Sequence, residues 1–246
     1  MASALAASWY LRPMSDRVCV VAGVGPGNGT ALSRKFAEQG YRVAMLARSQ
    51  DRLGRLEDEI PGAKGYPVDI ADREQASEVI ARIGRELGPV SVLVHNAAAG
   101  AFNSFMDVEP ATLELTFCTN VMSLLHLGQA VVPDMLDAGR GDILVIGNTA
   151  AWRGSANFAA FAPTKAAQRI LAQSMARSLG PQGIHVAYIV VDAVIDVPWT
   201  RRMNPKQPDE FFCQPSEIAE SVFHLSQQRP SAWTFEMDLR PFGEKW

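Results

Sequence analysis

The residues with the clearest chemical meaning form a glycine-rich run, 22–30, near the amino terminus. It reads Ala-Gly-Val-Gly-Pro-Gly-Asn-Gly-Thr and stands between an apolar stretch and a helical pattern. Glycines in that place allow a tight turn and a close backbone approach to a pyrophosphate, which then faces the positive end of the helix. The position between a strand and a helix makes this a dinucleotide-binding pattern. Its candidate cofactor-binding residues are Gly23, Pro26, Gly27, Asn28 and Gly29.

The end of the next apolar run, 44–49, bears on the choice of dinucleotide. A site selective for NAD carries an acidic residue here, which binds the ribose hydroxyls, and this segment has none. Arg48 instead offers a guanidinium fork suited to a 2′-phosphate, with help from Ser49 and Arg52. The sequence therefore favours NADP(H) over NAD(H). The plain alternative for Arg48 is a solvated residue at the start of a helix.

Short apolar runs alternate with longer amphipathic stretches from residue 17 onward, which is typical of βαβ units and a parallel sheet covered on both faces. The expected strands are Val18–Ala22, Arg42–Ala47, Lys64–Val68, Ser91–His95, Asp142–Ile146, Ile184–Val191 and Thr234–Asp238. The clearest expected helices are Ala31–Gln39, Arg73–Leu87 and Ala166–Leu179, followed by Gly40, by Gly88-Pro89 and by Gly180-Pro181 as stop signals. We therefore expect a single α/β domain over 15–246, a doubly wound parallel sheet of the Rossmann type, after a loose leader over 1–14.

Bulk properties exclude several other classes of protein. A net charge of −3 over 246 residues provides no basic field for nucleic acid. The three cysteines form no CxxC pair and the four histidines are scattered, so no metal site and no disulfide framework is expected. The first residues lack a basic region, and no apolar run approaches the ~20 residues of a membrane span. These features predict a cytoplasmic protein without membrane or nucleic-acid partners.

Several separate motifs after the glycine run resemble the short-chain dehydrogenase/reductase family over essentially all of Val18 to Phe242. Asp69-Ile70 is similar to the family's adenine-contacting pair, and His95-Asn96-Ala97-Ala98 is similar to its NNAG stretch. The resemblance implies that Asp69, Ile70, Asn96, Ala97 and Ala98 contact the cofactor. It also implies that Asn120 is the active-site asparagine and that Lys165 is the lysine of the YxxxK motif, which holds the nicotinamide ribose.

The chain departs from the family at the proton donor. In the family a tyrosine protonates the carbonyl oxygen and a serine steadies it, but the tyrosine position here is Phe161 and the serine position is Asn148. Enoyl reductases of the same fold place their tyrosine where this chain has Phe158. The family's Pro-Gly after the sixth strand is also replaced, although Ile195 keeps the apolar position that contacts the carboxamide. Losing a positioned acid costs on the order of 10² to 10⁴ in rate without affecting cofactor binding.

Two kinds of function remain open. An oxidoreductase of this kind could reduce an acceptor that needs no enzymic proton, such as an iminium carbon, with Asn148 and Asn120 donating hydrogen bonds. Thr149 or Asp192 could alternatively supply the proton. The rival is a non-catalytic NADP(H)-binding protein, a sensor or assembly partner. We favour the oxidoreductase because Asn120, Lys165 and Asn148-Thr149 remain polar at the reacting end.

Substrate and assembly are less defined. The irregular segment 196–215 lies beyond the carboxyl ends of the expected strands, so it is either a mobile substrate cover or a surface loop with an aromatic anchor. Aromatic residues hint at an apolar small-molecule substrate, which the sequence does not identify further. The family resemblance implies a homo-dimer or homo-tetramer, paired through the helices expected over Pro110–Ala138 and Asn157–Leu179.

Overall fold

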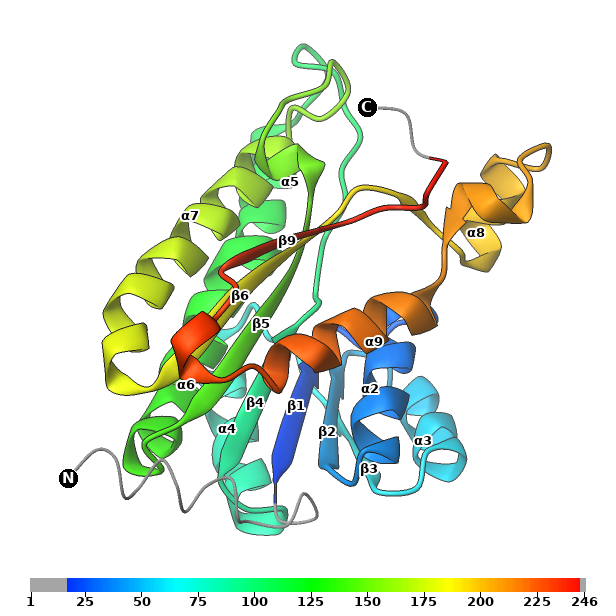
Figure 1. The fold of residues 1–246 in the computed structure, drawn as a ribbon. Helices are drawn as coiled ribbons and strands as arrows, with labels where there is room; N and C mark the ends of the chain where they lie inside the picture. The colour runs from blue at the N-terminus through cyan, green and yellow to red at the C-terminus, as the bar shows by residue number, and fades with distance from the viewer. Residues whose placement is uncertain (1–16, 244–246) are drawn as a thin grey trace.

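Seven parallel strands form the centre of the computed structural model, which describes residues 17–243 (Figure 1). They are β1 (Val18–Ala22), β2 (Arg42–Ala47), β3 (Ala63–Pro67), β4 (Val90–His95), β5 (Gly141–Asn148), β6 (Ile184–Val191) and β9 (Glu236–Leu239). Their order in the sheet is β3-β2-β1-β4-β5-β6-β9, and every neighbouring pair is parallel. The order reverses between β1 and β4, and ligands of open α/β sheets bind at such a switch point. The expected doubly wound fold is confirmed.

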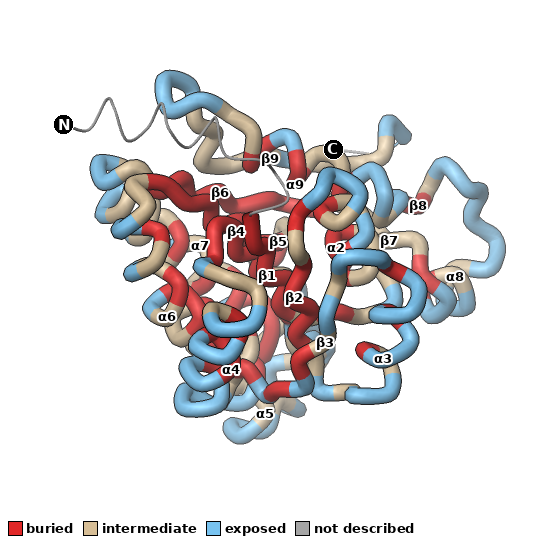
Figure 2. Tube along the Cα trace, turned by 90° about the horizontal axis from the view of Figure 1, so that it is seen from below, coloured by how far each residue is buried: buried red, intermediate tan, exposed pale blue. Residues whose placement is uncertain are grey.

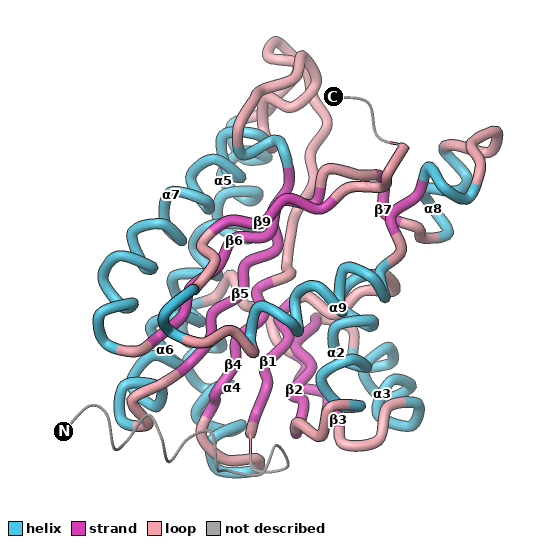
Figure 3. The backbone as a smooth tube through the Cα atoms, viewed as in Figure 1, coloured by secondary structure: helices cyan, strands magenta, loops and turns pink. Residues whose placement is uncertain are grey.

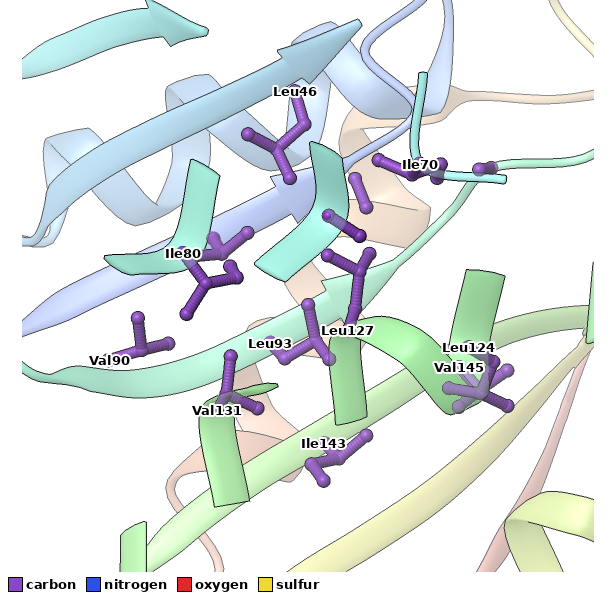
Figure 4. Close-up of a cluster of buried hydrophobic side chains, with 14 of the residues drawn as sticks. Leu46, Ile70, Ile80, Val90, Leu93, Leu124, Leu127, Val131, Ile143 and Val145 are labelled. Atoms are coloured by element: carbon purple, nitrogen blue, oxygen red, sulfur yellow. The ribbon is translucent and has the colours of Figure 1, made fainter. Parts of the chain in front are cut away.

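Helices cover both faces of this sheet, as Figure 3 shows. One face packs against α4 (Arg73–Glu86), α6 (Ser123–Asp137) and α7 (Ala162–Leu179), and the other against α2 (Asn28–Glu38), α3 (Gln50–Glu59) and α9 (Pro215–Ser226). Successive strand residues point to opposite faces, so Val20 joins the first core cluster and Val21 the second. Figure 4 shows part of the first cluster, and Figure 2 shows the central strands buried between the layers. Because both faces are buried, the central strands are mainly apolar, whereas the edge strands β3 and β9 are partly exposed and carry charged residues.

The long helical stretch 110–137 is interrupted by a π-helical turn. It consists of α5 (Pro110–Phe117), a π-helical turn (Cys118–Met122) and α6. The stretch Pro110–Asp137 is long and apolar enough to cross a membrane by length and composition, although polar and charged residues interrupt it. Leu124, Leu127 and Val131 are fully buried in the core that α6 shares with β4 and β5. Helices of a globular core pass the same test.

Several expected boundaries were wrong, each for a local reason. Helix α7 begins at Ala162 and not at Asn157, because an earlier start would place Pro163 in the helix interior, where it blocks a backbone hydrogen bond. The end of α7 at Leu179, with Gly180 as its C-cap, is as expected, and the chain then continues through a 3₁₀ turn until Gly183 adopts φ +88°. Strand β9 begins at Glu236 and not at Thr234, whose N–H donates to the Gln228 side chain. Strand β3 is displaced by one residue, and the leader 1–14 lies outside the described residues.

The segment 196–215 is more ordered than expected. It contains α8 (Pro198–Met203), and its flanks pair as a small parallel ladder of β7 (Val194–Ile195) and β8 (Phe212–Cys213). The Arg201 guanidinium donates two hydrogen bonds of 2.7 Å to Asp196 and one of 2.6 Å to Asp209, and it lies 4.0 Å from the Phe212 ring centroid. These hydrogen bonds lower the pKa of Asp196 to about 2. One arginine therefore links both flanks of α8 into a unit.

Candidate functional site

The glycine turn is locked to the neighbouring strand at the switch point. Gly23 has φ +89°, and a Cβ added there would lie 2.4 Å from Ala97 Cα, inside the van der Waals distance. The Asn96 side-chain amide donates to Gly23 O over 2.8 Å, and Asn96 N–H donates to Ala22 O over 2.9 Å. Asn96 thus joins the carboxyl ends of β1 and β4 and fixes the glycine turn against β4. Ala98, which comes next, is exposed there.

Gly23→Ala is expected to lower the free energy of unfolding by about 2–3 kcal/mol, because the new Cβ meets both a disfavoured φ and the Ala97 backbone. Urea denaturation of the cofactor-free protein measures this change. Gly25→Ala is the matched control, since a Cβ at Gly25 meets nothing within 4 Å and its φ is not positive. Equal losses in the two variants would contradict the close-approach role of Gly23.

The start of α2 fits a pyrophosphate. Asn28 and Gly29 are buried in the first turn of the helix and their backbone N–H groups precede the first helical acceptor, whereas Thr30 N–H donates to Gly25 O over 3.2 Å and Pro26 is exposed. The Asn28 side-chain oxygen is buried and has no hydrogen-bond partner among the described residues, which is rare in folded proteins. Val197 lies over the turn, because a Cβ on Gly27 would come within 2.7 Å of Val197 Cγ1. The turn therefore lies between the sheet and the segment that carries α8.

The residues expected to bind the ribose phosphate and adenine lie at the ends of adjacent strands. Arg48 is exposed directly after β2, and Asp69-Ile70 follows β3, which pairs with β2. Ser49 is the N-cap of α3, accepting a hydrogen bond of 3.4 Å from Arg52 N–H, so it has a structural role whatever else it binds. The Asp69 carboxylate accepts the Ala71 N–H over 3.0 Å, which fixes the turn. The geometry leaves the Arg48 guanidinium exposed for a phosphate.

A cavity of about 590 Å³ opens at the carboxyl ends of β5 and β6, the upper edge of the sheet in Figure 1. Asn148, Phe161 and Ile195, three of the residues predicted at the reacting end, line it. Asn148 is the last residue of β5, and its side-chain oxygen accepts the Ala150 N–H over 3.1 Å. Phe161 occupies the N-cap position of α7 and is buried. No tyrosine of residues 17–243 lines this cavity.

Lys165 does not line the cavity but is buried beneath it. Its Nζ donates to Ile146 O over 3.1 Å and to the Gln168 side-chain oxygen over 2.5 Å. Only 2% of the residue is exposed, and this burial lowers the pKa of the Lys165 amine to about 7. The lysine expected to hold the nicotinamide ribose is therefore bonded to interior acceptors in this structure.

Asn120 is held rigidly inside the π-helical turn. Its side-chain oxygen accepts Ala99 N–H over 2.8 Å, and its amide donates to Ala99 O over 3.1 Å and to Thr164 Oγ1 over 2.9 Å. A π-helical turn inside an α-helix is frequent at functional sites, and here it brings Asn120 to both the segment after β4 and the start of α7. Asn120 is fully buried, so it positions these segments instead of facing the cavity.

Gln168 is the residue that sequence reasoning missed. Its amide nitrogen donates to Asn120 O over 2.7 Å and lies 3.4 Å from His95 Nδ1, while its oxygen accepts from Lys165. His95 Nε2 lies 2.7 Å from Ser123 Oγ. Burial, with a further contribution from the Lys165 charge, lowers the pKa of His95 to about 3. The sequence did offer a signal for this contact, because a glutamine three residues after Lys165 lies on the same face of a helix and can reach the lysine.

Two residues expected as substitutes for the tyrosine proton donor are found at the cavity. Thr149 and Asp192 line the cavity, as the sequence reasoning required of them. Asp192 Oδ1 lies 3.9 Å from Arg153 and its Oδ2 lies 3.4 Å from Arg240. Tyr188 is fully buried in β6 and its hydroxyl lies 3.4 Å from Lys165 O; burial raises the pKa of that phenol well above its usual value. Tyr188 is therefore unsuited to replace the missing acid.

Comparisons with known proteins agree with this geometry. The family model described as short chain dehydrogenase matches residues 17–208. An uncharacterized oxidoreductase of Staphylococcus aureus (strain USA300) is 24% identical over 93% of this chain and 98% of its own length. A short-chain dehydrogenase from Rhodopseudomonas palustris is 28% identical with a TM-score of 0.79, covering 92% of this chain and 99% of that one. A metagenomic short-chain oxidoreductase solved with NADP is 26% identical with a TM-score of 0.82, covering 95% of this chain and all of that one.

Proposed function

Because the chain belongs to the short-chain dehydrogenase family, we propose that it is an NADP(H)-dependent oxidoreductase whose acceptor needs no tyrosine proton. The observation that carries this proposal is the cavity at the ends of β5 and β6, which is lined by Asn148 and Phe161 and by no tyrosine of the described residues. A phenyl ring has no ionisable hydrogen, so the substrate must tolerate hydride transfer without it. An iminium carbon meets this condition, because the nitrogen already carries the positive charge that a carbonyl gains only on protonation.

The glycine turn and Arg48 support NADP(H) as the cofactor. The turn is open at Gly25, where an added Cβ would meet nothing within 4 Å, and the exposed guanidinium at the end of β2 matches a 2′-phosphate. A related oxidoreductase of known structure carries NADP. When bound, the reduced cofactor supplies a hydride at the reacting end. The chain's own contribution there is to exclude water with Phe161 and to offer the Asn148 amide as a hydrogen-bond donor.

Arg48→Ser is expected to raise the Kd for NADPH about 10–100-fold and to leave the Kd for NADH within about twofold. The reason is that a charge-assisted hydrogen bond contributes about 1.5–3 kcal/mol, and only NADPH carries the 2′-phosphate. Fluorescence titration with both cofactors measures the change. Arg55→Ser, which removes an exposed arginine further along α3, serves as the control. Similar losses for NADH and NADPH would exclude Arg48 as the phosphate-binding residue.

The experiment that tests the function uses NADPH deuterated at the transferable position. The full-length protein is incubated with panels of ketones, enones and imines, and products are examined for deuterium by mass spectrometry. Label in an imine product supports the proposal. Label in a ketone product means that another group replaces Phe161, and Asp192→Asn and Thr149→Val then identify it. If NADPH binds and no acceptor gains label, the proposal is wrong.

A second candidate is a non-catalytic NADP(H)-binding protein, and one observation favours it. Lys165 donates its hydrogen bonds to Ile146 and Gln168 in the interior, away from the groove where a ribose would lie. A binding protein would hold NADPH and leave its transferable hydrogen in place with every acceptor. The labelling experiment therefore separates the two candidates directly.

The proposal also includes pairing of two or more copies through α6 and α7. An apolar groove of about 390 Å³ runs between these helices and is lined by Leu125, Val132, Met175 and Leu179. Apolar grooves exposed on a helix face are typical of subunit interfaces. Light scattering after size-exclusion chromatography measures the assembly, and a monomer would refute this part of the proposal.

A further inference from the structure

The cavity at the ends of β5 and β6 contains a single ionisable side chain among the described residues that line it. That side chain is Asp192, which follows β6. No lysine, arginine or histidine of the described chain lines the space, although Lys165 lies buried beneath it. A mainly apolar cavity with one carboxylate attracts positive charge and disfavours anions, because a low-dielectric wall screens charge poorly.

Aromatic faces surround the same space. Phe102, Phe158 and Phe161 form a cluster with ring centroids 5.4–6.1 Å apart, and Trp199 and Phe211 line the cavity from the segment around α8. Phe102 is 62% exposed and Trp199 50% exposed, so both keep apolar surface that a ligand in the cavity would cover. Aromatic rings attract cations through their negative faces, and clusters of them recognise alkylated ammonium groups.

The carboxylate of Asp192 forms two ion pairs with the protein, neither as short as a charge-assisted hydrogen bond. Arg153 approaches it at 3.9 Å with a side chain that is 70% exposed, and Arg240 approaches at 3.4 Å while also pairing with Asp238. Both distances exceed those of a tight charge-assisted hydrogen bond, and neither arginine lines the cavity. Asp192 therefore keeps capacity to attract a cation from the cavity side.

We infer that this cavity selects flat organic cations, with the positive nitrogen drawn to Asp192 and the ring system packed against the aromatic cluster. The inference deepens the proposed function and rests on it in one respect: the cation is also the hydride acceptor, as an iminium ion. The iminium carbon then gains hydride and forms a C–H bond, and the C=N π electrons become the nitrogen lone pair. NADPH is oxidised to NADP⁺, and no proton is consumed.

This chemistry gives the charge preference a role in turnover. The iminium substrate is positive, and the tertiary amine formed from it is neutral until it takes a proton from solvent. The attraction to Asp192 and to the aromatic faces is therefore present for the substrate and lost at the moment of reduction. The newly formed neutral amine is bound less tightly than the substrate until it is protonated in solvent, so the charge preference acts on substrate binding and product release and not on the rate of hydride transfer.

The test measures binding to the full-length protein without cofactor, by isothermal titration calorimetry. N-methylisoquinolinium, a permanent cation, is compared with isoquinoline at a pH where it is uncharged. We expect the cation to bind about tenfold more tightly, and Asp192→Asn to reduce that preference to within about twofold. Asp58→Asn is the matched control: it removes an exposed carboxylate of α3, outside the cavity lining, and should retain the preference.

Equal affinity for the two ring compounds, or a preference that Asp192→Asn leaves intact, would overturn the inference. Phe158→Leu adds a second check that does not alter charge, since it should weaken the cation more than the neutral ring. Failure of the function gives a different result. Cation-selective binding without deuterium transfer refutes the oxidoreductase and leaves the inference standing, whereas transfer to neutral acceptors without cation preference does the reverse.

Discussion

Replacing Phe161 by tyrosine is expected to raise the rate of NADPH-dependent ketone reduction about 10²–10⁴-fold, the usual contribution of a positioned general acid. The residue is 7% exposed and lines the cavity beside Asn148, so a phenol hydroxyl added to the ring enters the reacting space. Kinetics with a panel of ketones, followed by the absorbance of NADPH, measures the gain. The Kd for NADPH should stay within about twofold, because Phe161 lies away from the glycine turn and Arg48.

Phe158→Tyr is the matched control for this substitution. The Phe158 ring also lines the cavity, with its centroid 5.9 Å from that of Phe161, so it adds the same hydroxyl at a different point. It should not accelerate ketone reduction. If Phe161→Tyr binds NADPH and still reduces no ketone, then Phe161 is not the only element missing for carbonyl chemistry. The inward hydrogen bonds of Lys165 would be the next feature to change.

The parts of the fold that follow from local sequence were predictable. β1, β2 and β6 occur at the expected residues because buried parallel strands are uninterrupted apolar runs. The end of α7 at Leu179 was also predictable, because Gly180 carries the same stop signal as Gly88. The 3₁₀ turn that follows it was not, because its end at Gly183 depends on a close approach to Gly139 O. The ordering of segment 196–215 by Arg201 could not be predicted from the sequence either. Its partners Asp196 and Asp209 meet only once β7 and β8 pair.

At the candidate site, residue types were predictable and their orientations were not. Asn148, Phe161 and Ile195 do meet at one cavity, as strand ends and a helix start should. The direction of Lys165 could not be predicted, because it depends on Gln168 and on the Ile146 carbonyl, which reach it from α7 and β5. Whether Asp192 is a proton donor or a charge anchor is likewise a matter of which groups surround it in space.

The second prediction with a large expected effect concerns how the free energy of unfolding depends on pH, through the buried amine of Lys165. The folded state lowers the pKa of Lys165 from an ordinary 10.5 to about 7, so between these pH values the unfolded chain holds a proton that the folded chain has released. The contribution of Lys165 to stability therefore rises with pH through this window, by up to about 5 kcal/mol, whereas the buried Cys19 thiol, whose pKa is raised by burial, acts in the opposite direction above its ordinary pKa of 9.0. His95, the nearest titratable neighbour, has a pKa of about 3 and does not contribute in this range.

We expect Lys165→Met to remove this rise, since methionine has similar length and no proton to exchange. Urea denaturation of the cofactor-free protein at several pH values from 7 to 10 measures the slope of both proteins. Lys206→Met, which removes an exposed lysine, should keep the wild-type slope. Parallel curves for wild type and Lys165→Met would mean that the amine is solvated in the folded protein. A lost slope would show that the Lys165 amine is uncharged about half of the time at neutral pH. A lysine that is often uncharged lowers the pKa of a neighbouring acid less effectively. This property fits a site that works without a tyrosine acid.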